Sequence, residues 1–189
     1  SEWWWVAEIK GKIKTIFKDL KVYQGKKFDD NRGFLREIFR ENVIKKKLLF
    51  SIVSKSNKNV LRGLHLQTKK AQDKFITVLK GRILDVAVDV RRGSRTFGKH
   101  YKILLSEKNS KFLFIPRGFA HGFLGLDKEN IVLYSCSNYR HKKGEQTILW
   151  NDADLKINWG IKKPILSEKD KYAQTLKQFL NKWKKKLLK

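Results

Sequence analysis

The sequence predicts an all-β protein, built as an antiparallel barrel or jelly roll, that ends in a short helix. Between residues 60 and 150 the chain is a series of β-rich segments of about five to eight residues. Glycine, proline, asparagine or serine breaks such as "RRGSRTFG" and "LDKEN" separate these segments. Many short strands with regular turns, and almost no helical periodicity, are typical of β-sandwiches and barrels.

The length and composition fit one soluble domain. We expect a single domain over residues 1–189, with an N-terminal arm and first strands in 1–27 and a basic helix in 167–189. The one cysteine, Cys136, cannot form an internal disulfide. No apolar run reaches the roughly 18 residues of a membrane span, and the N-terminal "SEWWWVAEIK" is a poor secretion signal. These features lead us to expect a cytoplasmic protein.

The charge of the chain is unusual, because 44 Lys and Arg residues against 18 Asp and Glu give a formal net charge of +26. Such an excess suits an anionic partner, whether nucleic acid, a membrane surface or a phosphorylated small molecule. The lysines are spread through the chain, however, with short runs such as "KKK" at 45–47 and the final "KWKKKLLK". We interpret most of them as solvated surface charge, and expect neither nucleic acid nor a membrane as a partner.

In chain order, the first clear element is a hairpin in "KKFDDNRGFLREIF", where Asp29, Asp30, Asn31 and Gly33 mark a tight turn between two strands. Further strands are expected in "VLRGLHLQ", "KFITVLKGRILDVAVDV", "KHYKILLSE", "KFLFIP", "NIVLYSCSNY" and "EQTILW". The segment "PRGFAHG" has the glycines of a break between strands, although in a small barrel the stretch around His121 could also be a strand.

The last element is one amphipathic helix in "LSEKDKYAQTLKQFLNKWKKKLLK". Its apolar face is formed by residues three and four positions apart, namely Tyr172, Leu176, Leu180, Trp183 and Leu187. Ser167, followed by Asp170, is a suitable N-terminal cap. We expect this helix to pack on the barrel with its lysine-rich face in solvent.

Two of the four histidines, His65 and His121, lie in segments that a small barrel would bring to one cavity. A metal in such a barrel usually takes several His or carboxylate ligands, often with a His-x-His pair on one strand. Here the residue two after His65 is Gln67, the next few residues are neutral or basic, and Lys74 adds a positive charge. The sequence therefore argues against a metal site and for acid/base chemistry or plain binding.

Proton abstraction next to a carbonyl needs a neutral histidine, an acceptor that orients its other nitrogen, a cation or donor for the enolate oxygen, and a separate acid. Arg62, Lys74 and Tyr134 are chemically suited to the last two tasks. Taken alone, however, each of these residues fits an ordinary structural or surface role equally well. Spacing along the chain leaves both interpretations open.

A resemblance over roughly residues 28 to 170 favours the catalytic interpretation. The motifs that carry it are "FDDNRGFLREIF", "VLRGLHLQ", "VLKGRILDVAVDVRRGSRTFGK", "IPRGFAHGF", "LYSCSNY", "ILWNDADLKINW" and "LSEKD". In this order they resemble the dTDP-4-dehydrorhamnose 3,5-epimerases, which are cupin-superfamily enzymes of dTDP-rhamnose synthesis. A lone "PxGxxH" would have indicated only a cupin-like protein.

The resemblance implies a jelly-roll homodimer that needs no metal or other cofactor and acts on dTDP-4-dehydro-6-deoxy-glucose. Carbons C3'' and C5'' of the hexose flank the C4'' ketone, so each can lose a proton to give an enolate and regain one from the opposite face. By the same resemblance, His65 of "RGLH" is the base, Asp170 of "SEKD" pairs with it, and Tyr134 of the "LY" strand is the acid.

The substrate-binding residues that the resemblance implies are more numerous than the catalytic ones. Arg62 and Lys74 are expected near the sugar and the enolate oxygen, with His121 beside the same pocket. The remaining four are Arg32 and Glu37, expected to reach the nucleotide across a dimer interface, and Glu145 and Lys169, expected at further substrate contacts. Arginine and lysine suit a diphosphate because charge-assisted hydrogen bonds to its oxygens are strong.

The chain also departs from the family pattern. Phe50 and Ile52 stand where members usually carry a glutamine and an asparagine that contact the nucleotide, and a pair of tyrosines becomes Tyr139 and Arg140. These changes leave the base, its partner and the acid in place. Two alternatives stay open, an epimerase that inverts C3'' only and a non-catalytic cupin that binds a sugar nucleotide or nucleic acid.

Overall fold

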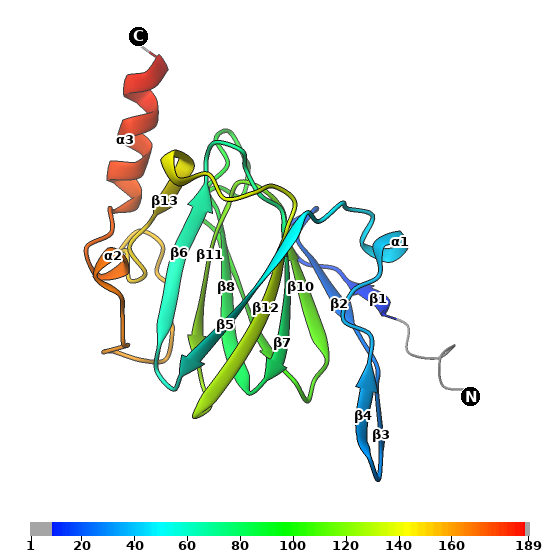
Figure 1. Cartoon of the computed structure of the whole chain (residues 1–189). Helices are drawn as coiled ribbons and strands as arrows, with labels where there is room; N and C mark the ends of the chain where they lie inside the picture. Colours follow the sequence, from blue (N-terminus) through cyan, green and yellow to red (C-terminus); the bar gives the residue numbers. More distant parts are fainter. Residues whose placement is uncertain (1–8, 188–189) are drawn as a thin grey trace.

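The computed structural model describes residues 9–187, which form two antiparallel sheets packed face to face (Figure 1). The six-stranded sheet has the order β1-β2-β10-β7-β12-β5, and the five-stranded sheet has the order β13-β6-β11-β8-β9. The strands of the first are β1 (Lys10–Ile13), β2 (Lys21–Gln24), β5 (Phe50–Asn57), β7 (Lys74–Lys80), β10 (Lys111–Ile115) and β12 (Glu129–Cys136). The strands of the second are β6 (Leu61–Gln67), β8 (Arg82–Asp89), β9 (His100–Ser106), β11 (Phe119–Gly125) and β13 (Glu145–Thr147). The predicted cupin-type jelly roll is confirmed.

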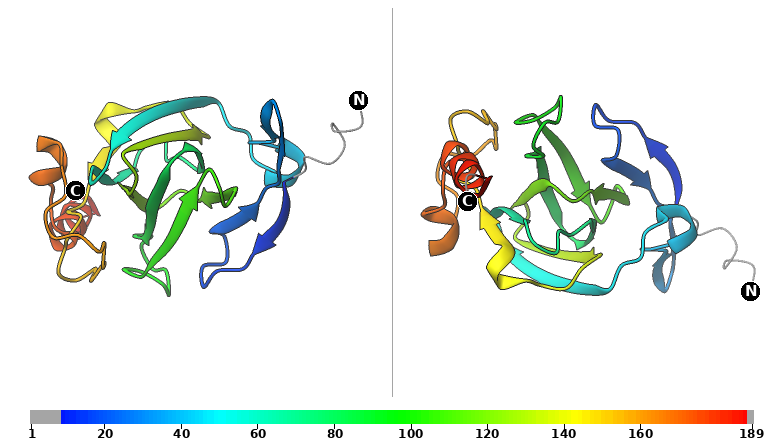
Figure 2. Two further views of the ribbon diagram at one scale, coloured as in Figure 1. Left: turned by 90° about the horizontal axis from the view of Figure 1, so that it is seen from below. Right: turned by 90° about the horizontal axis from the view of Figure 1, so that it is seen from above.

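Apolar side chains fill the space between the two sheets and also cover their outer faces. Val22, Ile76 and Val132 of the six-stranded sheet meet Ile83 and Leu105 of the other in the central core. A second core lies on the outer face of the five-stranded sheet, where the C-terminal segment packs. Figure 2 shows this segment on one side of the barrel and the N-terminal strands on the other. Strands covered on both faces explain the nearly continuous apolar runs of the sequence.

Strand β11 corrects the expectation that its glycines mark a break between strands. Every residue from Phe119 to Gly125 is buried, and β11 lies between β6 and β8 in the middle of the five-stranded sheet. Gly122 allows this strand to approach β6 closely, since a Cβ there would lie 2.7 Å from the Arg62 carbonyl oxygen. The glycines therefore serve close strand packing, which local sequence cannot distinguish from a turn.

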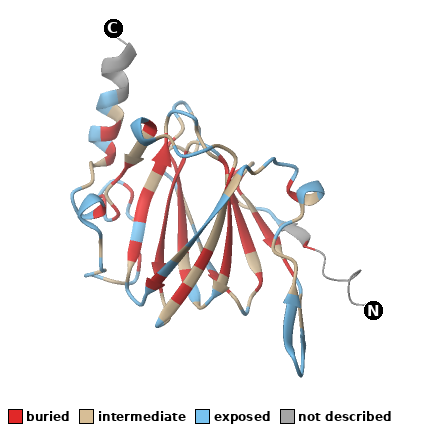
Figure 3. Ribbon diagram, viewed as in Figure 1, coloured by how far each residue is buried: buried red, intermediate tan, exposed pale blue. Residues whose placement is uncertain are grey.

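The predicted N-terminal hairpin is confirmed as β3 (Lys27–Asp30) and β4 (Gly33–Arg36), which form a separate two-stranded sheet that extends from the barrel. After it comes α1 (Glu41–Ile44), a short helix that the sequence did not predict. The hairpin and the edge strand β5 are largely exposed (Figure 3). Their exposed residues include large apolar side chains, among them Phe34, Leu35 and Val53.

The predicted C-terminal helix is two helices, α2 (Glu168–Lys171) and α3 (Leu176–Leu187). Ser167 caps α2 by accepting from the Asp170 amide, as expected. The chain then leaves the helix, because the Gln174 carbonyl accepts a hydrogen bond from the Leu149 amide. Thr175 and Gln178 start α3 through reciprocal side-chain to amide hydrogen bonds of 3.2 and 2.8 Å.

The apolar face of α3 also differs from the predicted one. Phe179 is buried and Leu180 packs on the same core, whereas Tyr172 lies before the helix and is exposed. The predicted contributions of the Trp183 and Leu187 side chains lie outside the described residues, as does the tryptophan-rich N-terminus at 1–8. Among the described residues, no helix is long and apolar enough to cross a membrane.

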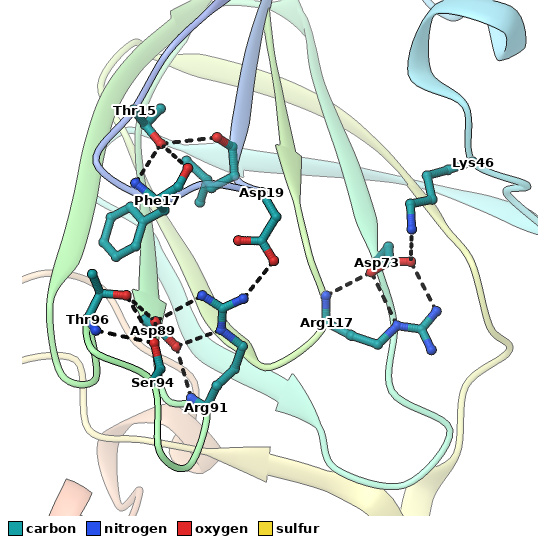
Figure 4. Close-up of polar contacts among 11 residues, drawn as sticks. Thr15, Phe17, Asp19, Lys46, Asp73, Asp89, Arg91, Ser94, Thr96 and Arg117 are labelled. Atoms are coloured by element: carbon teal, nitrogen blue, oxygen red, sulfur yellow. Dashed lines mark hydrogen bonds and ion pairs between the residues drawn. The ribbon is translucent and has the colours of Figure 1, made fainter.

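Two buried aspartates anchor loops at the ends of strands (Figure 4). Asp89, at the end of β8, accepts hydrogen bonds from the Arg91 guanidinium and from the hydroxyls of Ser94 and Thr96. Burial raises its pKa, but these donors outweigh burial and lower the pKa to about 2. Asp73 accepts from the amide and guanidinium of Arg117, which fixes the start of β7 next to Lys74.

Candidate active site

A cavity of about 310 Å³ opens between the sheets at the end of the barrel where β6 and β12 finish and where β7 and β13 begin. Five of the residues singled out from the sequence line it: His65, Lys74, Tyr134, Glu145 and Lys169. His65 comes from the five-stranded sheet, whereas Lys74 and Tyr134 come from the six-stranded sheet. The candidate base, His65, and the candidate acid, Tyr134, therefore line the cavity from opposite sheets.

An irregularity in β6 brings Arg62 and His65 to the same face of the sheet. His121 and Phe123, which are two residues apart on β11, pair with His65 and Arg62, which are three apart. On the other face, Leu61 and Leu64 both enter the outer core, again three residues apart. The extra residue lets two polar side chains face the interior from one strand.

Gly63 occupies the irregular position because no other residue fits there. It has a φ of +126°, and a Cβ would lie 2.6 Å from the Gly122 Cα on β11. Its amide also donates a hydrogen bond of 3.2 Å to Oδ2 of Asp170. The glycine of "RGLH" thus connects the strand that carries His65 to the helix that carries Asp170.

Asp170 forms the predicted pair with His65, with 2.6 Å between its Oδ1 and the histidine Nε2. Its side chain is buried, and the Ser167 cap fixes the turn of α2 on which it lies. Burial on its own raises the pKa of Asp170, but the hydrogen bond and charge of His65 and the Gly63 amide lower it below the usual range. The carboxylate is therefore ionised at neutral pH and orients the imidazole.

Burial is the largest influence on the pKa of both Lys74 and Tyr134. Burial lowers the pKa of Lys74, and this is opposed by negative charge at Asp85 and Glu145. Burial raises the pKa of the Tyr134 phenol, although the positive charge of Arg62 acts against the rise. Arg62 itself is fixed by a 2.9 Å hydrogen bond to the Ser56 hydroxyl of β5.

His121 lies deeper than the resemblance implied. It is buried, pairs with His65 across β11 and β6, and has its Nε2 2.8 Å from Oδ2 of Asp85. The other oxygen of this fully buried aspartate, Oδ1, has no hydrogen-bond partner among residues 9–187. His121 and Asp85 thus form a second histidine–aspartate pair beside the first, and neither is among the residues that line the cavity.

The outer part of the cavity contains an ion-pair cluster. Glu145 of β13 binds the guanidinium of Arg140 through both carboxylate oxygens and lies 3.4 Å from the Lys169 Nζ. The hydrogen bond from Arg140, together with the charge of Lys169, lowers the pKa of Glu145. Sequence reasoning noted Arg140 only as a departure from the family and assigned it no contact.

Several cavity-lining residues were not predicted, namely Gln67, Gln72, Cys136 and Gln146. Strand alternation could have found two of them, because Gln67 follows His65, and Cys136 follows Tyr134, by two positions. Phe50 and Ile52, noted as departures, also line the cavity, and Phe50 stacks on Tyr139 with ring centroids 5.7 Å apart.

Arg32 and Glu37 do not line this cavity. Arg32 is at the exposed turn of the β3–β4 hairpin, paired with Asp30 at 2.6 Å, and Glu37 follows the hairpin and binds Arg40 at 2.6 Å. Within residues 9–187, no group of three or more His, Cys, Asp or Glu side chains is arranged to hold a metal ion.

Comparison with known proteins assigns the family. The family model described as dTDP-4-dehydrorhamnose 3,5-epimerase matches residues 14–178. The epimerase of that name from Salmonella typhimurium is 43% identical over 89% of this chain and 96% of its own length. The one from Neisseria gonorrhoeae is 42% identical over 88% of this chain, which spans about half (52%) of that relative.

A solved structure agrees with the sequence relatives. The dTDP-6-deoxy-D-glucose-3,5-epimerase of Legionella pneumophila, in complex with dTDP-4-keto-L-rhamnose, superposes with a TM-score of 0.84 at 38% identity, covering 88% of this chain and 93% of that one. A model that spans most of the chain, relatives above 40% identity and the same fold lead to one conclusion: the chain belongs to the dTDP-4-dehydrorhamnose 3,5-epimerase family.

Proposed function

We propose that this chain is an isomerase that inverts C3'' and C5'' of a dTDP-linked 4-keto-6-deoxyhexose by proton abstraction and reprotonation through an enolate. The observation that carries the proposal is the 2.6 Å His65–Asp170 pair beside a cavity that Tyr134 and Lys74 line from the opposite sheet. The substrate class follows from the family and from the dTDP-4-keto-L-rhamnose bound by the Legionella relative.

His65 acts as the base, and the pairing defines which of its nitrogens can do so. An ionised carboxylate can only accept a hydrogen bond, so the proton of the neutral ring is on Nε2, toward Asp170. Nδ1 then carries the lone pair that removes a proton from the carbon next to the ketone. Asp170 stabilises the imidazolium that forms, as a buried anion in direct contact with it.

The enolate oxygen needs positive charge beside it, and the returning proton needs a donor on the face of the sugar opposite His65. Lys74 and Arg62 supply positive charge for the oxygen that develops at C4''. Tyr134 returns the proton, and because burial raises its pKa, the phenol is protonated at neutral pH. Inversion requires that a proton is removed from one face of the sugar and returned to the opposite face, and a base and an acid from opposite sheets fit this requirement.

The remaining predicted residues serve substrate binding in this proposal. Glu145 and Lys169 contact the substrate at the outer part of the cavity, whereas His121 pairs with Asp85 behind the cavity lining and supports the site from there. Arg32 and Glu37 lie outside the cavity of their own chain, and in this proposal they reach the nucleotide of a second subunit across the dimer interface.

We infer a homodimer of single-domain subunits. Strand β5 is at the edge of the six-stranded sheet, and Val53 on this strand and Phe34 on the hairpin are 59% and 48% exposed. A sheet edge can pair with another chain, and exposed apolar side chains mark contact surfaces between proteins. Light scattering of Val53→Asp should give a monomer where the wild type gives a dimer, and a wild-type monomer would contradict the inference.

Turnover of the dTDP-4-keto sugar by wild type and His65→Ala tests the function. We expect His65→Ala to lose at least about 10²-fold in kcat, as for removal of a general base. His100→Ala is the matched control, because His100 is on the far edge strand β9 and should leave kcat unchanged. Full activity of His65→Ala would remove His65 from the mechanism.

The alternatives have their own readouts. In deuterated water, NMR should show exchange at both C3'' and C5'', whereas exchange at C3'' alone would assign the single epimerase. Salt-dependent binding of duplex DNA without turnover would indicate the non-catalytic binder.

A cytoplasmic location fits the free, buried thiol of Cys136, since structural disulfides are typical of oxidising compartments.

A further inference from the structure

The ion-pair cluster of Arg140, Glu145 and Lys169 has two cations for one carboxylate. Both cationic side chains are mostly in solvent, with exposed fractions of 69% for Arg140 and 56% for Lys169, whereas Glu145 is only 23% exposed. Exposed ion pairs contribute little to stability, so either cation can leave the carboxylate at small cost. The cluster therefore has positive charge available to a ligand.

The backbone on both sides of Arg140 is fixed, although its side chain is exposed. Gln67, which is buried on the strand of His65, donates to the Tyr139 carbonyl at 3.0 Å and accepts from the His141 amide at 2.9 Å. Gln72 donates to the Asn138 carbonyl at 2.8 Å. Buried or partly buried glutamines thus hold this segment against the cavity, which gives Arg140 a defined position and a movable guanidinium.

The wall formed by β5 offers little to a charged ligand. Phe50 and Ile52 line the cavity there, and neither side chain can donate a hydrogen bond. Among the side chains that line the cavity, the cations are Lys74, Arg140 and Lys169, and the one carboxylate is Glu145. If the sugar lies between His65 and Tyr134, the two phosphates that follow it must find their donors among the cations at the outer part.

We propose that Arg140 is a substrate-binding residue that exchanges Glu145 for the diphosphate of the nucleotide sugar. In the free protein Glu145 holds the guanidinium at the cavity, and in the complex the same fork of N–H donors binds the phosphate oxygens, for which it is well matched. Lys169 stays with Glu145 and neutralises it. This proposal rests on the proposed function, since it takes the sugar end of the ligand to be at His65.

Calorimetric titration of the full chain with dTDP tests the proposal without requiring turnover. We expect Arg140→Ala to raise the Kd for dTDP at least about ten-fold and to weaken its dependence on salt, as for loss of one charge-assisted phosphate contact. Arg82→Ala is the matched control, because Arg82 is also an exposed arginine paired with one acid, Asp127, and should change the Kd less than about two-fold.

A double variant separates contact from simple neutralisation. If Arg140 binds phosphate directly, the double variant Arg140→Ala with Glu145→Gln keeps the raised Kd for dTDP. If the double variant recovers the wild-type Kd, Arg140 only neutralises the charge of Glu145 and the proposal is wrong. An unchanged Kd for Arg140→Ala also overturns it. If the wild type turns over the substrate but Arg140→Ala binds dTDP normally, the epimerase function stands and the role of Arg140 is wrong. If Arg140→Ala weakens dTDP binding but the wild type shows no turnover, the phosphate site stands and the epimerase function is wrong.

Discussion

Replacement of Asp170 by asparagine removes the charge behind the base and keeps the size of the side chain. In the proposed mechanism His65 takes a proton from the sugar, and the imidazolium that forms has its Nε2 2.6 Å from Oδ1 of a carboxylate that is 3% exposed. Two unit charges about 4 Å apart in a medium with an effective dielectric constant of about 20 attract by about 4 kcal/mol. Loss of that attraction in the transition state corresponds to about 10³-fold in kcat.

Steady-state kinetics on the dTDP-4-keto sugar measures this loss directly. We expect kcat to fall about 10³-fold in Asp170→Asn with a small change in KM, because the charge on His65 exists only after proton transfer. Since the pKa of Asp170 is lower than usual, the carboxylate is ionised in the neutral range, so the substitution removes a full negative charge from the wild-type site.

Asp152→Asn is the control for a buried aspartate outside the cavity. Asp152 is also buried in the C-terminal part of the chain and accepts the Leu176 amide at 2.9 Å. We expect this variant to lose stability and to keep its kcat. A fall of less than about ten-fold in Asp170→Asn, or an equal fall in Asp152→Asn, would refute the assignment of Asp170 as the charge partner of the base.

Three further predictions concern the acid and the stability of the fold. Tyr134→Phe should still exchange substrate protons with deuterated water but invert the carbons at least about 10²-fold more slowly, since it keeps the base and lacks the acid; NMR of the recovered sugar measures both, and unchanged inversion would exclude Tyr134 as the acid. Asp89→Asn should lower the free energy of unfolding in urea by about 2 kcal/mol at pH 7, because the pKa of Asp89 is about 2 when folded. The ionised form favours folding, so this difference should shrink to about half at pH 3, and a constant difference would contradict its electrostatic origin. Thr175→Ala should cost about 1 kcal/mol in the same assay through loss of the α3 cap, and a value near zero would mean that α3 does not unfold with the barrel.

Strand alternation depends on local sequence and predicted the strands, whereas the site residues were named from their chemistry and from the family resemblance. The turn in "DDNRG" predicted the hairpin, and "KFITV" puts Lys74 on the same face as the core residue Ile76. Strand alternation did not predict that Arg62 and His65 share a face, since they are three positions apart and only the irregularity opposite β11 aligns them. That irregularity depends on Gly63 and Gly122, whose role is visible only when both strands are in contact.

Contacts between distant segments were beyond local reasoning. Asp170 is 105 residues from His65 in sequence, and only the family resemblance named it. The break between α2 and α3 arises from pairing of Gln174 with the strand segment at Ile148, which helical periodicity cannot reveal. Predictions that depend on one segment, such as the β3–β4 hairpin, were correct. The prediction of one C-terminal helix was wrong, because the backbone at Gln174 pairs with a second segment instead of continuing the helix.

The division of the site between strands and connecting segments explains how one departure from the family pattern, Arg140, can coexist with the proposed chemistry. His65, Lys74 and Tyr134 lie on strands that are paired on both sides, so their positions are fixed by the sheets. Arg140 and Lys169 lie on connecting segments or on a short helix, where a change of side chain moves no strand. A tyrosine can therefore become Arg140 without displacing His65 or Tyr134, and binding of the nucleotide can change while the proposed proton transfer is preserved.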